Sequence, residues 1–222
     1  MRKIETKKSK NILLVFGFAV LNFLILGCAA NSQIEQSPGV EHPETAGFRV
    51  ITREQISPPV AAYNFSLIDQ SGEIVSLEEL EGSVVMISFL YTHCPEACPL
   101  VAANFRSVQD QLITDIDSRE LIQVLVTTDP DRDDPDRLRR YTEALGGQWY
   151  FLTGSTEDLQ NVWDGYSIYH EIRDRTQEIV VFHSYKTFLI DRQGNLQYEF
   201  VGVWFPDDIL PDIQYLLNQN EE

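Results

Sequence analysis

Apolar residues recur along most of the chain in blocks that are typical of alternating strands and helices. The segment Val84–Leu90 is almost continuously apolar, as is 121–126, and such runs are typical of strands buried on both faces of a parallel sheet. Each run is followed by a segment in which apolar residues recur with helical spacing. The pattern predicts the hairpin 65–75, the strands 84–90, 121–126, 149–152, 186–190 and 196–201, and the helices 98–112, 135–146, 156–166 and 206–217.

Local signals mark where several of these elements begin and end. Asp134 and Pro135 have the residue types of a helix cap and a first helical position, and Gly146 stands where that helix ends. A strand–helix–strand unit followed later by two strands and a helix is the order of a thioredoxin-like fold. We therefore expect one α/β domain over residues 60–222, with a central mixed sheet, flanking helices and an N-terminal β-hairpin extension.

The N-terminus has the organisation of a secretory leader. Basic residues in the first ten positions precede an apolar run from Ile12 to Gly27, which is short for a membrane span. The run ends in Leu-Ile-Leu-Gly before Cys28, a sequence that resembles the lipobox of bacterial lipoproteins. We expect a signal peptide over residues 1–27, lipidation of Cys28 and a flexible tether over 28–59. The alternative is a short uncleaved anchor, and either arrangement predicts a membrane-anchored, extracytoplasmic domain in the bacterial cell envelope.

The net charge argues against nucleic acid as a partner. The chain has 17 Lys and Arg against 34 Asp and Glu; residues 1–27 hold five basic residues and one acidic residue, so 12 basic and 33 acidic residues remain, a formal charge of −21. A strongly negative field repels phosphate and favours cations or basic surfaces, and it also keeps a protein soluble.

Two of the three cysteines are candidates for chemistry at the end of the Val84–Leu90 strand. Cys94 and Cys98 are four residues apart, so a helix that begins between them presents both sulfurs on one face. The N–H groups at a helix start stabilise thiolates, the form that binds soft metals. The spacing alone equally suits a structural disulfide, redox chemistry or a metal site. Glu96, between the cysteines, is expected to face solvent or a partner, with a contact near the sulfurs as a secondary prediction.

An acidic segment follows the second buried strand. Asp129, Asp131 and Asp133 have the alternate spacing of an EF-hand loop, but its sixth position is Asp134 instead of Gly and its twelfth is Arg140 instead of Glu. Calcium binding is therefore not expected. Asp129 stands at the carboxyl end of a central strand, the edge where sites of α/β folds gather, and we expect it near the cysteine site.

Four motifs in one order carry a resemblance to a known family. They are Thr-His-Cys-Pro-Glu-Ala-Cys-Pro at 92–99, the acidic segment 129–138, Leu-Thr-Gly at 152–154, and Phe-His-Ser at 182–184 ahead of Phe-Leu-Ile-Asp at 188–191. Together they resemble the Sco/SenC family over about residues 60–220. Members of that family are membrane-anchored, thioredoxin-like proteins that bind copper and help to assemble the dinuclear copper A centre of cytochrome c oxidase.

The resemblance implies a copper site made of Cys94, Cys98 and His183. It further implies a metallochaperone that delivers copper to the copper A-bearing subunit, with another periplasmic copper chaperone as a further partner. Two thiolates and one imidazole are a soft set that suits Cu(I), and Cu(II) stays open. Zinc is the competing metal, although structural zinc usually takes four protein ligands. Phe182 departs from the family, in which the residue before the ligand histidine is often acidic.

The position of His183 in the expected fold agrees with that implied role. In a thioredoxin-like fold, the loop before the second-last strand faces the cysteine turn, so a histidine there can reach the sulfurs. The other histidines are weaker candidates: His42 lies in the expected tether, His170 has no partner motif, and His93 is beside Cys94 on extended chain, where neighbouring side chains point apart.

The main alternative function is enzymatic. A thiol-disulfide oxidoreductase would use Cys94 and Cys98 to reduce the cysteines of a copper-accepting protein, and a redox or copper sensor is a third class. The spacing is one residue longer than the C-x-x-C of thioredoxins, and no proline lies between Pro135 and Pro206, where thioredoxins place a cis-proline before the second-last strand. These departures favour the metallochaperone.

Overall fold

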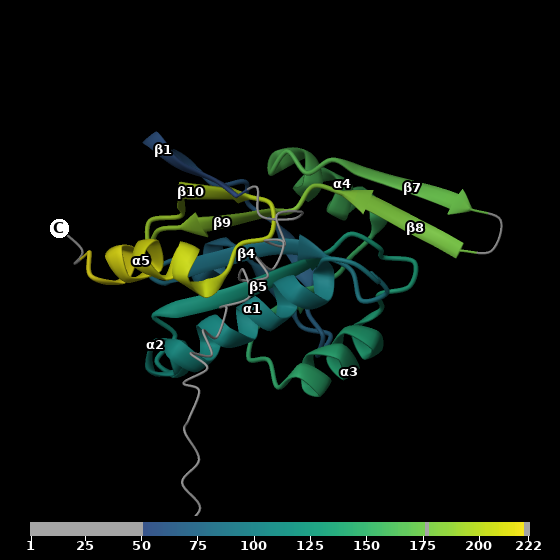
Figure 1. Cartoon of the computed structure of the whole chain (residues 1–222), viewed down its shortest axis with the longest axis horizontal. Coiled ribbons are helices and arrows are strands. Elements are labelled where there is room, and N and C mark those ends of the chain that lie inside the picture. Colours follow the sequence, from purple (N-terminus) through teal and green to yellow (C-terminus); the bar gives the residue numbers. More distant parts are fainter. Residues whose placement is uncertain (1–50, 176–177, 220–222) are drawn as a thin grey trace, which may run out of the picture. The chain divides into compact units, whose positions relative to one another are not determined.

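The computed structural model describes residues 51–175 and 178–219, and its centre is a six-stranded sheet in the order β1-β10-β9-β4-β5-β6 (Figure 1). Strands β4, β5 and β6 pair in parallel, whereas β9 pairs antiparallel with β4 and β10, and β1 antiparallel with β10. The strands of this sheet are β1 (Thr52–Ala61), β4 (Val84–Leu90), β5 (Leu121–Thr127), β6 (Tyr150–Leu152), β9 (Lys186–Ile190) and β10 (Asn195–Val201).

Helices and two hairpins complete the domain. Hairpin β2–β3 precedes β4, and hairpin β7–β8 precedes β9. The hairpin strands are β2 (Ser66–Ile68), β3 (Ile74–Ser76), β7 (His170–Arg175) and β8 (Glu178–His183). The helices are α1 (Cys98–Gln111), α2 (Ile113–Asp117), α3 (Pro135–Leu145), α4 (Thr156–Gly165), α5 (Pro206–Leu217) and the 3₁₀ helix η1 (Glu78–Leu80).

The sheet separates two hydrophobic cores, in agreement with the almost continuously apolar sequence of β4. Successive side chains of a strand point to opposite faces, and all seven residues of β4 are buried. Met86 and Leu90 pack with α1, α3 and α5, whereas Val85, Ile87 and Phe89 pack with α4 and hairpin β2–β3. A strand that is buried on both faces has apolar residues at almost every position, so the sequence alone predicts it.

The expected thioredoxin-like architecture is confirmed, and so are its local signals. Asp134 caps α3 by accepting a hydrogen bond from the backbone N–H of Arg137 at 2.7 Å, and Pro135 is the first helical residue. Gly146 ends α3 in the left-handed conformation, with φ of 63°, which glycine adopts without steric cost. The hairpin expected at 65–75 is present as β2–β3.

The N-terminal boundary of the domain differs from the expectation. The predicted tether includes residues 52–59, but these residues belong to β1, which pairs with β10 at the edge of the sheet. Nearly every residue of β1 is exposed, so its apolar pattern is weak, and its order comes from hydrogen bonds to β10. The expected leader, Cys28 and the rest of the tether lie outside the described residues. No helix within 51–175 and 178–219 is both long and apolar enough to cross a bilayer.

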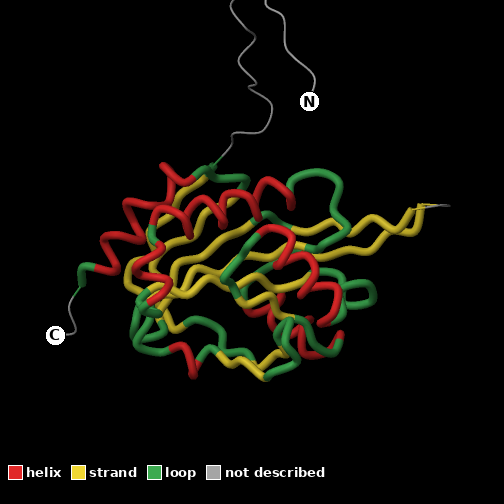
Figure 2. Tube along the Cα trace, turned by 90° about the horizontal axis from the view of Figure 1, so that it is seen from below, coloured by secondary structure: helices red, strands yellow, loops and turns green. Residues whose placement is uncertain are grey.

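The hairpin β7–β8 is a second element that the sequence pattern did not predict. Its two strands pair with each other and with no strand of the central sheet, and the hairpin extends away from the body of the domain (Figures 1 and 2). His183 is the last residue of β8 and pairs with His170 at the start of β7. The hairpin therefore brings its base, with His183, beside the carboxyl ends of β4 and β5.

Candidate metal centre

The cysteine turn joins the carboxyl end of β4 to α1. Cys94 lies in the turn, where its backbone N–H donates to the carbonyl of Tyr91 at 3.4 Å, and Cys98 is the first residue of α1. Both are free thiols, and their exposed fractions are 8% for Cys94 and 1% for Cys98. The expected placement of the two sulfurs at a helix start is therefore present.

The two thiols have opposite protonation tendencies. The Cys98 side chain donates a hydrogen bond to the Cys94 sulfur, and together with the backbone N–H groups of Cys98 and Glu96 this lowers the pKa of Cys94 to about 6. The same hydrogen bond, followed by burial, raises the pKa of Cys98. At neutral pH the pair is a thiolate at Cys94 that is stabilised by a thiol at Cys98.

His183 lies beside the cysteines from a distant part of the sequence. Its Nε2 is 3.7 Å from the Cys98 sulfur, and its Nδ1 is 3.0 Å from the backbone carbonyl of Ser184. The carbonyl accepts only from a protonated Nδ1, so this contact leaves the Nε2 lone pair directed at the sulfur side. Burial lowers the pKa of His183 to about 4, which keeps the ring neutral at physiological pH.

Two tyrosines pack against the His183 ring. The Tyr91 ring meets it edge-on with centroids 5.8 Å apart, and the Tyr185 ring lies 5.0 Å away at an interplanar angle of 64°. Tyr91 directly follows β4 and Tyr185 directly precedes β9, so both rings are fixed by the central sheet. The imidazole is therefore held in orientation by packing as well as by its hydrogen bond.

A buried carboxylate anchors the start of the cysteine turn. Asp133 has no exposed surface and accepts hydrogen bonds from the backbone N–H of Thr92 at 3.0 Å, the Thr92 hydroxyl at 2.6 Å and the Thr127 hydroxyl at 2.7 Å. The guanidinium of Arg137 donates to the Thr92 hydroxyl at 2.8 Å. These bonds connect the segment two residues before Cys94 to the end of β5 and to α3.

The two secondary candidates from the sequence lie near the site without a side-chain contact to a ligand. The Asp129 carboxylate pairs with the Arg132 guanidinium at 2.5 Å, and this guanidinium lies over the Tyr91 ring at 5.8 Å. Glu96 is exposed and contributes its backbone N–H to the Cys94 sulfur. Asp129 thus contacts the site through an arginine and a tyrosine, and Glu96 through its main chain.

The remaining described histidines have other partners. The His93 side chain is 38% exposed, and its Nδ1 lies 3.2 Å from the Thr92 hydroxyl. The His170 ring stacks on Trp163 with centroids 4.0 Å apart, and its Nε2 donates to the Thr128 carbonyl at 2.8 Å. His170 thereby ties the base of hairpin β7–β8 to the end of β5.

Cys94, Cys98 and His183 gather without forming a finished cage. Within residues 51–175 and 178–219, no three side chains among His, Cys, Asp and Glu already converge on one point at metal-binding distances. The Cys98 sulfur lies 3.7 Å from His183 Nε2, and the Cys98 side chain is the first cause of the lowered pKa of Cys94.

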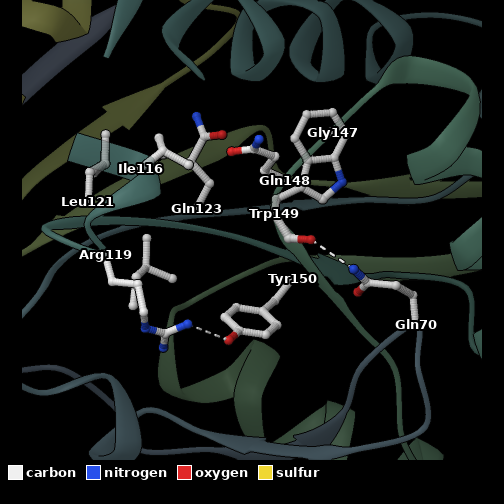
Figure 3. Close-up of a pocket in the computed structure, with 10 residues that line it drawn as sticks. Gln70, Ile116, Arg119, Leu121, Gln123, Gly147, Gln148, Trp149 and Tyr150 are labelled. Atoms are coloured by element: carbon white, nitrogen blue, oxygen red, sulfur yellow. Dashed lines mark hydrogen bonds between the residues drawn. The ribbon is translucent and has the colours of Figure 1, made fainter. Parts of the chain in front are cut away.

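A hollow of about 240 Å³ lies at the amino ends of β5 and β6, whereas the cysteine turn follows the carboxyl end of β4. Figure 3 shows residues that line the hollow. It is lined by the amino ends of β5 and β6, and two of its polar side chains bond to neighbours in its own wall: Arg119 donates to the Tyr150 hydroxyl at 3.0 Å and Gln70 to the Trp149 carbonyl at 2.9 Å. Sites of parallel α/β sheets gather at the carboxyl ends of strands, where the cysteine turn lies.

The sequence reasoning missed Asp133 and Tyr91 as residues of the site. From the sequence we predict a helix cap at Asp134 and expect only Asp129 of this acidic segment near the cysteines. One signal was available: Asp133, like Asp129, follows the carboxyl end of β5, so a polar group there lies at the site edge. No signal indicated that Tyr91 would meet a strand 90 residues further along the chain.

Comparison with known proteins places this chain in a family. The SCO1/SenC family model matches residues 53–218. A SCO2-like protein of Rickettsia prowazekii is 30% identical over 139 residues, which cover 61% of this chain and 67% of that protein.

Two solved structures share the fold. The crystal structure of Arabidopsis thaliana ScoI with copper bound has a TM-score of 0.57 and 26% identity, covering 69% of this chain and 94% of that one. BsSco, described as a member of the Sco family of cytochrome c oxidase assembly proteins and as having a disulfide switch, has a TM-score of 0.60 and 24% identity, covering 75% and 100%. Because the family model matches residues 53–218, about three quarters of its length, this chain belongs to the SCO1/SenC family.

Proposed function

We propose that this protein is a membrane-anchored copper chaperone that holds copper on Cys94, Cys98 and His183 and delivers it to the copper A centre of cytochrome c oxidase. One observation carries the proposal: the fold brings His183 Nε2 to within 3.7 Å of the Cys98 sulfur at the end of a cysteine turn in a SCO1/SenC chain. The copper-bound Arabidopsis relative supports the choice of metal.

The spacing of the donors suits a small metal ion. An ion of zinc's size binds a thiolate sulfur at about 2.3 Å and an imidazole nitrogen at about 2.0 Å. When the angle between these two bonds is about 120°, the sulfur and the nitrogen are about 3.7 Å apart. The Cys98 and His183 donor atoms have this separation. Cys94 completes the set when its sulfur turns from the Cys98 thiol toward the ion.

The protonation states favour a soft monovalent ion. Cys94 is already a thiolate at neutral pH, and His183 is neutral with Nε2 free to donate. Binding therefore displaces one proton, that of the Cys98 thiol. Two thiolates and one imidazole give a net negative soft donor set that suits Cu(I), and three protein ligands leave one side for transfer to a recipient.

The anchor and the partners of this proposal rest on the sequence. Lipidation at Cys28 would hold the domain at a membrane of the cell envelope, and we expect the copper A-bearing subunit at the same membrane. Copper would arrive from another periplasmic copper chaperone. The strongly acidic mature chain favours partners whose docking surfaces are basic.

A second function is favoured by the lowered pKa of Cys94. A thiolate that is populated from about pH 6 is a competent nucleophile toward a disulfide, and Cys98 is placed to resolve the mixed disulfide that would form. In that reaction, Cys94 attacks one sulfur of the substrate disulfide, Cys98 displaces the substrate thiol, and the protein leaves with a Cys94–Cys98 disulfide. The substrate would be the oxidised cysteine pair of a copper-accepting protein.

Anaerobic competition for Cu(I) tests the proposal. The reduced full-length protein in detergent is titrated against a chromophoric Cu(I) chelator, together with Cys94→Ser, Cys98→Ser and His183→Ala, and His93→Ala serves as the matched control beside the site. We expect one tightly bound Cu(I) per chain, a loss of affinity of 10-fold or more in each ligand variant, and no change in the control.

Two outcomes would contradict this assignment. If His183→Ala binds Cu(I) as tightly as the parent, the histidine is not a ligand. If the parent binds no copper but reduces the oxidised cysteine pair of a copper A-bearing subunit, the oxidoreductase function replaces the chaperone.

A further inference from the structure

Thr92 lies two residues before Cys94 and is hydrogen-bonded to a carboxylate outside the cysteine turn. It is 8% exposed and follows the end of β4 by two positions. Its backbone N–H donates to Oδ2 of Asp133 at 3.0 Å, and its hydroxyl donates to Oδ1 of the same carboxylate at 2.6 Å. Because the two bonds use different carboxylate oxygens, they fix both the backbone of Thr92 and the rotation of its side chain.

Arg137 binds Thr92 from the first turn of α3. Its Nε donates to the Thr92 hydroxyl at 2.8 Å, and its Nη2 donates to the Thr92 carbonyl at 3.4 Å. The hydroxyl is therefore both a donor to Asp133 and an acceptor from Arg137. The backbone N–H, the hydroxyl and the carbonyl of Thr92 all have partners in the segment that leads into α3 or in α3 itself.

Asp133 is itself fixed to the central sheet. It has no exposed surface, and it accepts a hydrogen bond from the hydroxyl of Thr127, the last residue of β5, at 2.7 Å. Its backbone N–H donates to the carbonyl of Asp129 at 3.0 Å. The contacts therefore run from the end of β5 and from α3 to a single residue of the cysteine turn.

The two cysteines differ in how their backbones are supported. Cys98 is the first residue of α1, so a helix of 14 residues holds it. Cys94 lies in the turn, where its backbone N–H donates to the Tyr91 carbonyl at 3.4 Å, a long bond for a backbone pair. Thr92 is one of the two residues between Tyr91 and Cys94, so its position decides how the chain enters Cys94.

We propose that Thr92 is a positioning residue whose hydroxyl, held between Asp133 and Arg137, fixes the cysteine turn so that the Cys94 sulfur is ready to bind copper. The inference rests on the proposed function and adds a determinant of its affinity. A ligand that is held in place before the ion arrives loses less conformational freedom on binding. Removing the hydroxyl should therefore weaken binding although all three ligands remain.

Thr142 provides a matched control in the same domain. It is 5% exposed, it lies in α3, and its hydroxyl accepts from the indole N–H of Trp149 at 3.1 Å. This hydrogen bond leads to the residue before β6 and not to the cysteine turn. Thr142→Val and Thr92→Val both remove a buried hydroxyl and keep the side-chain shape, so the pair separates a general loss of stability from a loss of positioning.

The test uses the reduced full-length protein in detergent and two measurements. Anaerobic competition with a chromophoric chelator gives the Cu(I) affinity, and hydrogen exchange of the metal-free protein, read by mass spectrometry over residues 91–97, reports the order of the turn without copper. For Thr92→Val, we expect a Cu(I) affinity about 10-fold below that of the parent and faster exchange in this peptide. Thr92→Ser keeps the hydroxyl, and Thr142→Val acts at a distant site, so both should stay within about twofold of the parent in affinity and keep its exchange rate.

A second variant tests the same hydroxyl from its other partner. Arg137→Met removes the guanidinium at a half-buried position and leaves the bonds to Asp133 in place. We expect its Cu(I) affinity to fall about threefold, with faster exchange over residues 91–97. This variant decides the question if Thr92→Val does not fold.

The outcomes that overturn the inference are distinct from a failure of the proposed function. If the parent binds Cu(I) and Thr92→Val loses no more affinity than Thr142→Val, the hydroxyl does not position the ligand. If Thr92→Ser loses as much as Thr92→Val, the methyl group and not the hydroxyl is responsible. If the parent itself binds no Cu(I), the proposed function has failed and the inference about copper fails with it.

Discussion

Lowering the pH from 7 to 5 should destabilise the metal-free protein through His183. Burial lowers the pKa of this histidine from 6.5 to about 4 in the folded state, while the unfolded chain keeps the ordinary value. Between these values the unfolded state binds a proton that the folded state does not, so the free energy of unfolding falls as the pH falls. The stability from the neutral ring is present above about pH 6.5 and is lost progressively toward pH 4.

The size of the effect follows from the two pKa values. The full difference corresponds to roughly 3 kcal/mol, at about 1.4 kcal/mol for each pH unit between the two pKa values. Between pH 7 and pH 5, linkage predicts that the free energy of unfolding decreases by roughly 2 kcal/mol. This is a large fraction of the total stability of a typical domain.

Urea unfolding of the reduced, metal-free protein at pH 7 and pH 5 measures the effect. The matched control is His183→Gln, which lacks the titrating ring but keeps every other titrating group. One of these groups is Cys94, whose lowered pKa of about 6 also makes the free energy of unfolding rise with pH. The parent should lose roughly 2 kcal/mol more than the control between the two pH values. Equal losses in the parent and in His183→Gln would refute the assignment of a buried neutral histidine.

Two further predictions concern the cysteine turn. The pKa of Cys94 is about 6, so alkylation of Cys94 by iodoacetamide should be half-maximal near pH 6. Because the Cys98 thiol is the first cause of this lowered pKa, Cys98→Ala should raise the midpoint by about one pH unit or more. A midpoint above pH 8 in the parent would contradict a thiolate at Cys94. Asp133→Ala should lower the free energy of unfolding by about 3 kcal/mol, because it leaves three buried donors without their acceptor. In urea unfolding, the exposed control Asp117→Ala should stay within about 0.5 kcal/mol of the parent, and a similarly small effect of Asp133→Ala would show that the turn does not depend on this anchor.

The parts of the fold that the sequence predicted are those with local causes. The strand β4 is apolar on both faces because helices or hairpins cover both, and α3 begins and ends at residues whose side chains or backbone conformations suit a cap. The two sulfurs of the cysteine turn are likewise placed by a spacing of four residues. Each of these inferences needs only neighbours within a few positions of the chain.

The parts that the sequence did not predict depend on distant pairing. Strand β1 is exposed along its length and exists because β10 offers it hydrogen bonds. Asp133 and Tyr91 contribute to the site through partners in other elements, and neither partnership has a local pattern. Only the family resemblance and the expected fold predicted His183 beside the cysteines, because 85 residues separate it from Cys98 in the sequence.

The separate hairpin β7–β8 has a consequence for the kinetics of metal exchange. Its described strands pair with each other and with no strand of the central sheet, and His170 bonds its base to the Thr128 carbonyl. The hairpin can therefore open locally at a free-energy cost below that of global unfolding. Copper shared between the cysteine turn and His183 would cross-link the hairpin to the domain, and its amide protons would then exchange more slowly with solvent. Release to a recipient would need only this local opening, so a tightly held ion could still leave on the time scale of a hairpin's motion.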